Sequence, residues 1–192
     1  MNQQINESTQ SSKNIWLIII AVVVVLIIGG GIYWWKSSTT RVQWVKYENS
    51  RCNYSLEYPE NWVIETQNPL YVILNSSENE QAKQNIEPNQ IRDSGYMPDI
   101  TITYYSSVKM GLGVERLEEF VNKNPYLSDT KRINFAGTDK AWEMIMGGDR
   151  EAYMIMVEHD GHLYQIGFNN RPKKSALTEI DNRIIKSFQF ID

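Results

Sequence analysis

Residues 152–169 read AYMIMVEHDGHLYQIGFN and predict a β-hairpin. Two segments rich in apolar residues flank Asp160-Gly161, a dipeptide that favours the tight turn between antiparallel strands. A two-residue turn fixes the register, so we expect four facing pairs: His159 with His162, Val157 with Tyr164, Ile155 with Ile166 and Tyr153 with Phe168. Strand side chains alternate between two faces, so these eight share one face. Six of them are large and apolar or aromatic, which predicts a core face.

The opposite face of the same hairpin is less uniform. It is semi-apolar and carries Met154, Met156 and Glu158 against Gly167, Gln165 and Leu163. Such a face predicts a covering element, and it also allows a small-molecule cleft.

Apolar alternation and helical spacing extend the prediction outward from this hairpin. Further strands are expected at residues 42–48, 54–58, 71–74, 99–105, 130–135, 140–146 and 188–191, and helices at 114–123 and 173–187. The glycines of Met110–Gly113 predict a flexible lead-in to the first helix. Residues 75–98 are polar and rich in Asn, Gln and Glu, so we expect a long loop there. Hairpin-linked strands with two helices indicate an α+β fold, an antiparallel sheet with helices packed on its faces.

The N-terminal segment has a different character. Ile15–Trp35 is 21 residues long and contains no charge. At about 1.5 Å per residue, a helix of this length spans roughly 31 Å, the thickness of a hydrocarbon core. The segment exceeds the apolar region of a cleaved signal peptide, and no small-residue cleavage site follows it. We therefore expect a disordered tail at 1–14, a single transmembrane helix at 15–35, a linker at 36–41 and one soluble domain at 42–192.

The charges beside this segment leave the orientation in the membrane open. Before the segment, Lys13 is offset by Glu7, whereas Lys36, Arg41 and Lys46 follow it. Basic flanks favour the cytoplasmic side, which would place the domain there. Large domains are nevertheless often translocated regardless of flanking charge.

Composition excludes several classes of protein. The net charge is −4, and residues 1–35 contain one acid (Glu7) and one base (Lys13), so the remainder also carries −4. An acidic domain without clustered Lys and Arg neutralises phosphates poorly, so we expect no nucleic-acid partner. Cys52 is the only cysteine, which excludes an internal disulfide and a thiolate metal cluster.

Patterns typical of catalysis are missing from the sequence. There is no Gly-x-Ser-x-Gly, no P-loop and no Gly-x-Gly-x-x-Gly. His159 and His162, the only histidines, should be neighbours at the hairpin end, where Asp160 could add a third metal ligand. A structural zinc site normally has four ligands, and both imidazoles continue the apolar face. We therefore assign no catalytic, cofactor-binding or metal-binding residue and expect no cofactor.

Three motifs follow one another at residues 54–62, 133–142 and 184–190. The first reads YSLEYPENW and contains a Pro-x-x-Trp corner; the second reads INFAG and leads through Ala141-Trp142 into the next strand; the third reads IIKSFQF and ends a helix. In this order they resemble the PsbP-like family, the extrinsic subunits of the photosynthetic oxygen-evolving complex and their non-photosynthetic relatives, whose fold is shared by a Ran-binding nuclear transport factor.

The resemblance covers about residues 42–192 and implies an α/β/α sandwich around an antiparallel sheet, which agrees with the pattern of strands and helices. It also implies that an anchored, non-photosynthetic member lies outside the cytoplasm with its N-terminus inside. The matching motifs are structural, so no catalytic residue carries over to this chain.

Taken together, these features predict a single-pass, membrane-tethered, extracytoplasmic domain that is not an enzyme and binds or scaffolds another envelope protein. The bilayer is the expected partner of residues 15–35. Residues 75–98, with Tyr96 and Met97 near their end, are the expected contact surface for a protein, the alternative being an insertion without function. Alternatives for the domain are a ligand-binding or sensor ectodomain using the Met154/Met156 face, and an anchored hydrolase or metal-dependent enzyme using His159 or His162.

Overall fold

A computed structural model describes residues 42–91, 94–148 and 150–191 of the chain. Its strands are β1 (Trp44–Asn49), β2 (Tyr54–Pro59), β3 (Val63–Asn68), β4 (Tyr71–Asn75), β5 (Ile100–Tyr105), β6 (Leu127–Phe135), β7 (Thr138–Met146), β8 (Ala152–His159), β9 (His162–Phe168) and β10 (Gln189–Phe190). Its helices are α2 (Ser77–Gln84), α3 (Val108–Leu112), α4 (Leu117–Lys123) and α5 (Glu179–Ser187), with one 3-10 turn, η1 (Lys174–Ala176).

The predicted tail at 1–14, transmembrane helix at 15–35 and linker at 36–41 lie outside the described residues. Within the part of the chain that the structure describes, no helix has the length and apolar character needed to cross a membrane.

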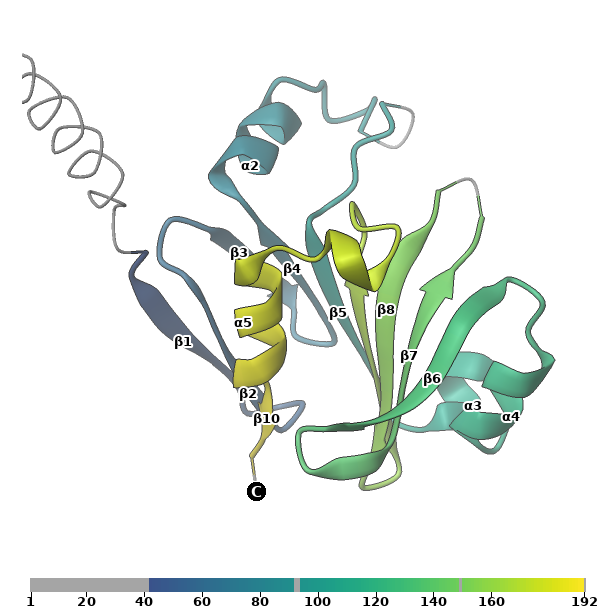
Figure 1. Cartoon of the computed structure of the whole chain (residues 1–192). Helices are drawn as coiled ribbons and strands as arrows, with labels where there is room; N and C mark the ends of the chain where they lie inside the picture. The colour runs from purple at the N-terminus through teal and green to yellow at the C-terminus, as the bar shows by residue number, and fades with distance from the viewer. Residues whose placement is uncertain (1–41, 92–93, 149, 192) are drawn as a thin grey trace, which may run out of the picture. The chain divides into compact units, whose positions relative to one another are not determined.

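The strands form two antiparallel sheets (Figure 1). The large sheet has seven strands in the order β3-β4-β5-β9-β8-β7-β6, and the small sheet has three in the order β1-β2-β10. The third strand of the small sheet comes from the end of the chain: Gln189 and Phe190 of β10 pair with Ser55 and Tyr54 of β2. The α+β class is therefore as predicted, whereas the expectation of one sheet is wrong.

The hairpin of β8 and β9 has the predicted register. His159 pairs with His162, and Val157, Ile155 and Tyr153 pair with Tyr164, Ile166 and Phe168. Its turn places Asp160 and Gly161 at φ 50° and 79°, as a tight hairpin turn of this type requires. The six large side chains of the predicted core face are at most 3% exposed, which confirms that this face is buried.

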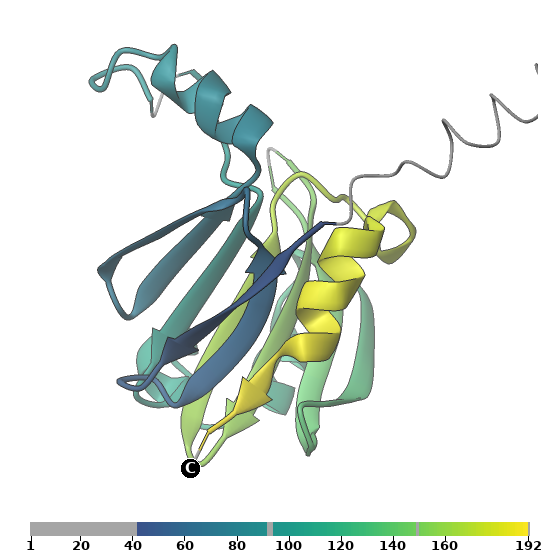
Figure 2. The same cartoon turned by 90° about the vertical axis from the view of Figure 1, so that its left-hand side faces the viewer.

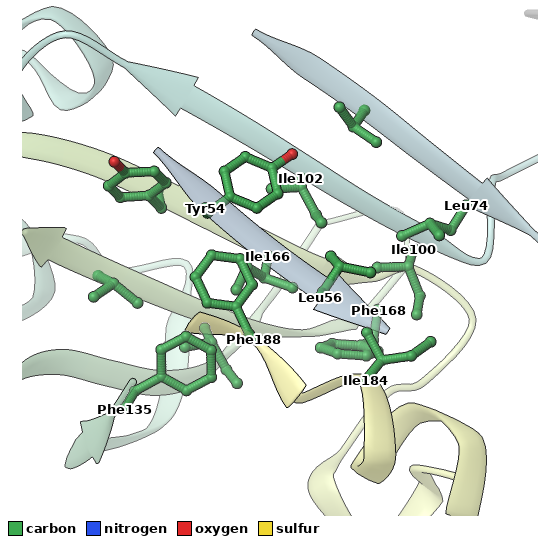
Figure 3. Close-up of a cluster of buried hydrophobic side chains, with 14 of the residues drawn as sticks. Tyr54, Leu56, Leu74, Ile100, Ile102, Phe135, Ile166, Phe168, Ile184 and Phe188 are labelled. Carbon is green, nitrogen blue, oxygen red and sulfur yellow. The ribbon is translucent and has the colours of Figure 1, made fainter. Parts of the chain in front are cut away.

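The small sheet and α5 cover that core face (Figures 2 and 3). Tyr54 and Leu56 of β2 and Ile184 of α5 project into the core and meet Ile166 and Phe168 of β9 (Figure 3). Apolar side chains at helical spacing on α5 explain why this helix packs here with its charged side outward.

Helices α3 and α4 cover part of the opposite face of the large sheet. Val108, Leu117 and Val121 of these helices pack on Met144, Met156 and Leu163, all six side chains being buried. The semi-apolar face is therefore packed against helices at Met156, and the covering element expected from the sequence is present.

The chain leaves the small sheet for the large one at the Pro-x-x-Trp corner. The Trp62 amide donates to the Pro59 carbonyl (2.9 Å), and the turned chain enters β3 at the edge of the large sheet. The expected pattern lacked β3, because an edge strand that buries little has weak apolar alternation.

Two helical segments also differ from expectation. Met110–Gly113 is not a flexible lead-in: it forms most of α3, which Ser107 caps and Gly113 ends at φ 73°. The helix expected at 173–187 is split, because Thr178 and Asp181 form a capping box that starts α5 at Glu179, and η1 stands before it.

Candidate interaction site

Residues 76–98, which we call the arm, connect β4 to β5 beyond the ends of the large sheet (Figures 1 and 2). The expected long loop is partly wrong, because α2 occupies eight of these residues and buries none of them. Helix-forming Glu, Gln, Ala and Lys follow the capping Ser76, whose hydroxyl accepts from the Asn79 amide (3.2 Å). The arm is therefore a helical projection without a core of its own.

Polar bonds hold the start of the arm against Asn75 and Asp99, the residues that flank it. The Ser76 amide and hydroxyl both donate to Asp99 Oδ2 at 2.8 Å. Asn75, which is 0% exposed, accepts from the Asp99 amide (3.3 Å) and donates to Glu80 Oε2 (3.1 Å). These bonds fix the first turn of α2 against the β4–β5 junction.

The middle of α2 is held by Lys83. Its ammonium pairs with Glu65 of β3 and lies 4.0 Å from Glu80 Oε2. Burial disfavours the charged ammonium, but the hydrogen bond and charge of Glu65 outweigh burial and raise the pKa of Lys83. The ion pair therefore persists at neutral pH and ties the helix to the sheet edge.

Residues 94–98, at the end of the arm, are also held by hydrogen bonds. Asn79 Nδ2 donates to the Met97 carbonyl and Asn169 Nδ2 to the Pro98 carbonyl, each at 3.0 Å. Arg150 Nη1 donates to the Gly95 carbonyl (2.8 Å). Bonds at both ends give the arm a defined position on the domain.

The outward side of the arm is polar. Asn79, Glu80 and Lys83 of α2 face the sheet, so the exposed side of the helix carries Glu78, Gln81, Ala82 and Asn85. Tyr96 and Met97, the contact residues expected from the sequence, are only half-exposed. The most exposed part of the arm is therefore α2, which lacks the apolar spacing by which helices are usually recognised in sequence.

The two histidines do meet at the hairpin end, but each is engaged in packing. The His159 ring stacks on Phe190 with centroids 3.8 Å apart and planes at 8°. His162 Nδ1 lies 2.9 Å from Tyr104 Oη and 3.0 Å from the Ser106 carbonyl oxygen. Asp160 Oδ2 is 3.5 Å from His159 Nε2, and the described residues contain no group of three or more His, Cys, Asp or Glu side chains that could hold a metal ion.

Cys52 is also in a structural position. It is 1% exposed, and its thiol donates to the Pro69 carbonyl (3.3 Å). Burial raises the pKa of Cys52, which keeps the side chain in the unreactive thiol form.

Glu143 is a buried carboxylate on the core face of β7. It accepts from Tyr153 Oη (2.9 Å) and from Lys174 Nζ (2.5 Å), and the carboxylate is 9% exposed. Burial alone would raise the pKa of Glu143, but the hydrogen bonds from Lys174 and Tyr153 and the charge of Lys174 hold it below its ordinary value of 4.5. Through these bonds to its Oε2, the Glu143 carboxylate links η1 to the sheet.

We expect Glu143→Gln to lower the free energy of unfolding by about 1–3 kcal/mol at neutral pH. Because the folded pKa lies below 4.5, the stabilisation is complete above that value and is lost as the pH falls through the folded pKa. Urea unfolding at about pH 7 and about pH 3 should show a difference between the two proteins that shrinks on acidification. Glu158→Gln, which breaks a more exposed pair with Lys140, is the control. An equal loss of stability in that variant would contradict a stabilising role for the buried Glu143 carboxylate.

Comparison with known proteins gives similarities of structure. No protein-family model matches the chain, and no curated protein matches it. Among solved structures, cyanobacterial PsbP (CyanoP) of Synechocystis sp. PCC 6803 is similar, with a TM-score of 0.44 and 11% identity over 80% of this chain and 95% of that one. The Ran-binding protein Mog1p of Saccharomyces cerevisiae has a TM-score of 0.37 and 7% identity over 79% of this chain and 97% of that one. The three sequence motifs resemble the PsbP-like family, whose fold a Ran-binding factor shares, and the two solved structures are of these two kinds. The similarity is one of fold alone.

Proposed function

We propose that this chain is a single-pass membrane protein whose domain lies outside the cytoplasm, has no enzymatic role, and binds or scaffolds another envelope protein through the arm. One observation carries the proposal: α2 buries no residue, yet bonds at both ends of the arm hold it in place. A short helix in water is marginal without packing, so these bonds maintain a surface that the core does not need. A positioned, exposed, polar helix is suited to recognition by a protein.

In this proposal the uncharged residues 15–35 anchor the domain in the membrane. Eight residues, 36–43, separate this segment from β1. At no more than about 3.5 Å per residue, they reach roughly 28 Å, which keeps the domain close to the bilayer. The partner is therefore sought among proteins in or at the same membrane.

Replacing residues 76–98 by Asn-Gly tests the proposal. Leu74 and Ile100 are paired, so a two-residue turn between Asn75 and Asp99 can close the β4–β5 hairpin. We expect the melting temperature of the full chain to stay nearly unchanged, because α2 buries no residue. A photo-reactive residue at position 81 should cross-link one specific envelope protein in cells, and pull-down of that protein should be abolished by the replacement.

Two point variants sharpen this experiment. Gln81→Arg changes the exposed side of α2 and should reduce capture of the same protein, whereas Asn122→Arg, at an exposed position on α4, should leave capture intact. If the chain lacking the arm captures that protein as well as the unchanged chain does, the arm is not the binding surface.

A further inference from the structure

The outer side of the small sheet contains a hollow of about 330 Å³ beside α5. This side faces away from the core, since Tyr54 and Leu56 of the central strand point inward and their neighbours along the strand point outward. The polar side chains that line the hollow come from β1, β2, β10 and α5 and include Lys46, Ser55, Glu57, Arg183, Lys186 and Gln189.

Basic side chains predominate in this lining, with three cations against one carboxylate. Arg183 Nη2 donates to Glu57 Oε2 (3.0 Å), and its Cζ lies 4.1 Å from the centroid of the Trp44 ring, which positions the guanidinium. Lys46 pairs with Glu48 at 3.3 Å. Both pairs are about half exposed and therefore weak, so these cations can turn to a bound anion. Among the described residues, Lys186 forms no ion pair.

Ser55 adds a hydroxyl at a buried position. It is 2% exposed and lines the hollow. The other serine of the lining is Ser187, whose Oγ accepts from the Glu57 amide (2.9 Å) and donates to the Ile184 carbonyl (3.0 Å). The Ser55 hydroxyl can therefore donate to an acceptor that enters the hollow.

We propose that this hollow binds a phosphate group, carried either by a soluble phosphate ester or by a lipid headgroup. Phosphate oxygens accept charge-assisted bonds from Arg183, Lys46 and Lys186 and a further bond from the Ser55 hydroxyl. The planar guanidinium of Arg183 suits two phosphate oxygens, and the lysines supply point charges from the other side. This site lies on the small sheet and does not involve the arm.

The test uses the full chain in maltoside micelles, which contain no phosphate, and follows the backbone amide signals of Ser55 and Gln189. Titration with inorganic phosphate at constant ionic strength should shift both signals to saturation.

Ser55→Ala combined with Lys186→Gln should weaken binding by about tenfold or more, as expected when charge-assisted contacts are lost. Lys186→Gln alone, an exposed change that the fold tolerates, should weaken it in the same direction. Lys123→Gln, an exposed lysine on α4, should have no effect.

A second measurement distinguishes the two sources of phosphate. In nanodiscs of phosphatidylglycerol without added phosphate, the same shifts should be present at the outset if the headgroup is the ligand. Shifts that need added phosphate in these nanodiscs would support a soluble ester instead. Shifts that grow linearly, that sodium chloride reproduces, or that persist unchanged in the Ser55 and Lys186 variants would overturn the proposal.

Discussion

Asp181→Ala is expected to lower the free energy of unfolding by about 3 kcal/mol, close to the cost of breaking a buried ion pair. The Asp181 carboxylate is 1% exposed and accepts from Arg171 Nε and from the Thr178 amide, both at 2.8 Å. Alanine removes both bonds at once. It leaves the Arg171 guanidinium, which is 21% exposed, without its carboxylate and leaves the first turn of α5 with half of its capping box.

Urea unfolding followed by circular dichroism at neutral pH measures this effect. Asp181→Asn keeps an acceptor for the Thr178 amide but loses the charge, so its cost should be intermediate. The matched control is Asp139→Ala, which breaks the exposed pair with Arg132 and should cost less than about 1 kcal/mol. Equal losses for the Asp181→Ala and Asp139→Ala proteins would show that the buried pair does not stabilise the fold.

Phe188→Ala should be at least as damaging, at about 3–5 kcal/mol, because it removes a buried ring and leaves a cavity. Phe188 is 3% exposed and stacks on Tyr54 with centroids 5.1 Å apart and planes at 12° (Figure 3). Its ring also lies 5.3 Å from that of Phe135 and 5.4 Å from that of Phe190. The side chain therefore joins the end of α5 to both sheets.

Chemical denaturation of the Phe188 variants gives the measurement. Phe188→Leu retains most of the apolar volume and should cost less than half as much as Phe188→Ala. Phe120→Ala on α4 is a useful control, because that ring is only half-buried and packs at the edge of the cluster that α3 and α4 form with Met144, Met156 and Leu163. A loss for Phe188→Ala no greater than that for Phe120→Ala would contradict the central position of this ring.

The core hairpin could be predicted from sequence because its information is local. Asp160-Gly161 fixes the turn, the turn fixes the register that places Tyr164 opposite Val157, and strand alternation puts both side chains on the core face. The second sheet could not be predicted in this way. Residues 42–48 and 54–58 were expected as strands, but their separation from the large sheet depends on Pro59, Trp62 and the distant β10.

The sequence marks residues 75–98 as the candidate contact segment but does not indicate that they contain the helix α2. Residues 75–98 have no apolar spacing, so their sequence predicts a loop, because hydrophobic periodicity is the main signal of a helix. The bonds that hold α2 involve Asp99, Glu65 and Asn169, which lie far from it in sequence and approach it only once the strands have paired. A capping serine before a run of helix formers at Ser76 was the one local signal available.

The pairing of β10 with β2 has a consequence for how the chain is made. Gln189 meets Ser55, which was synthesised 134 residues earlier (189 − 55). At cellular rates of translation this interval is on the order of ten seconds. Throughout it Tyr54 and Leu56 lack the cover that Ile184 and Phe188 later provide. The inner face of β2 therefore stays open to solvent and to chaperones until the last helix emerges.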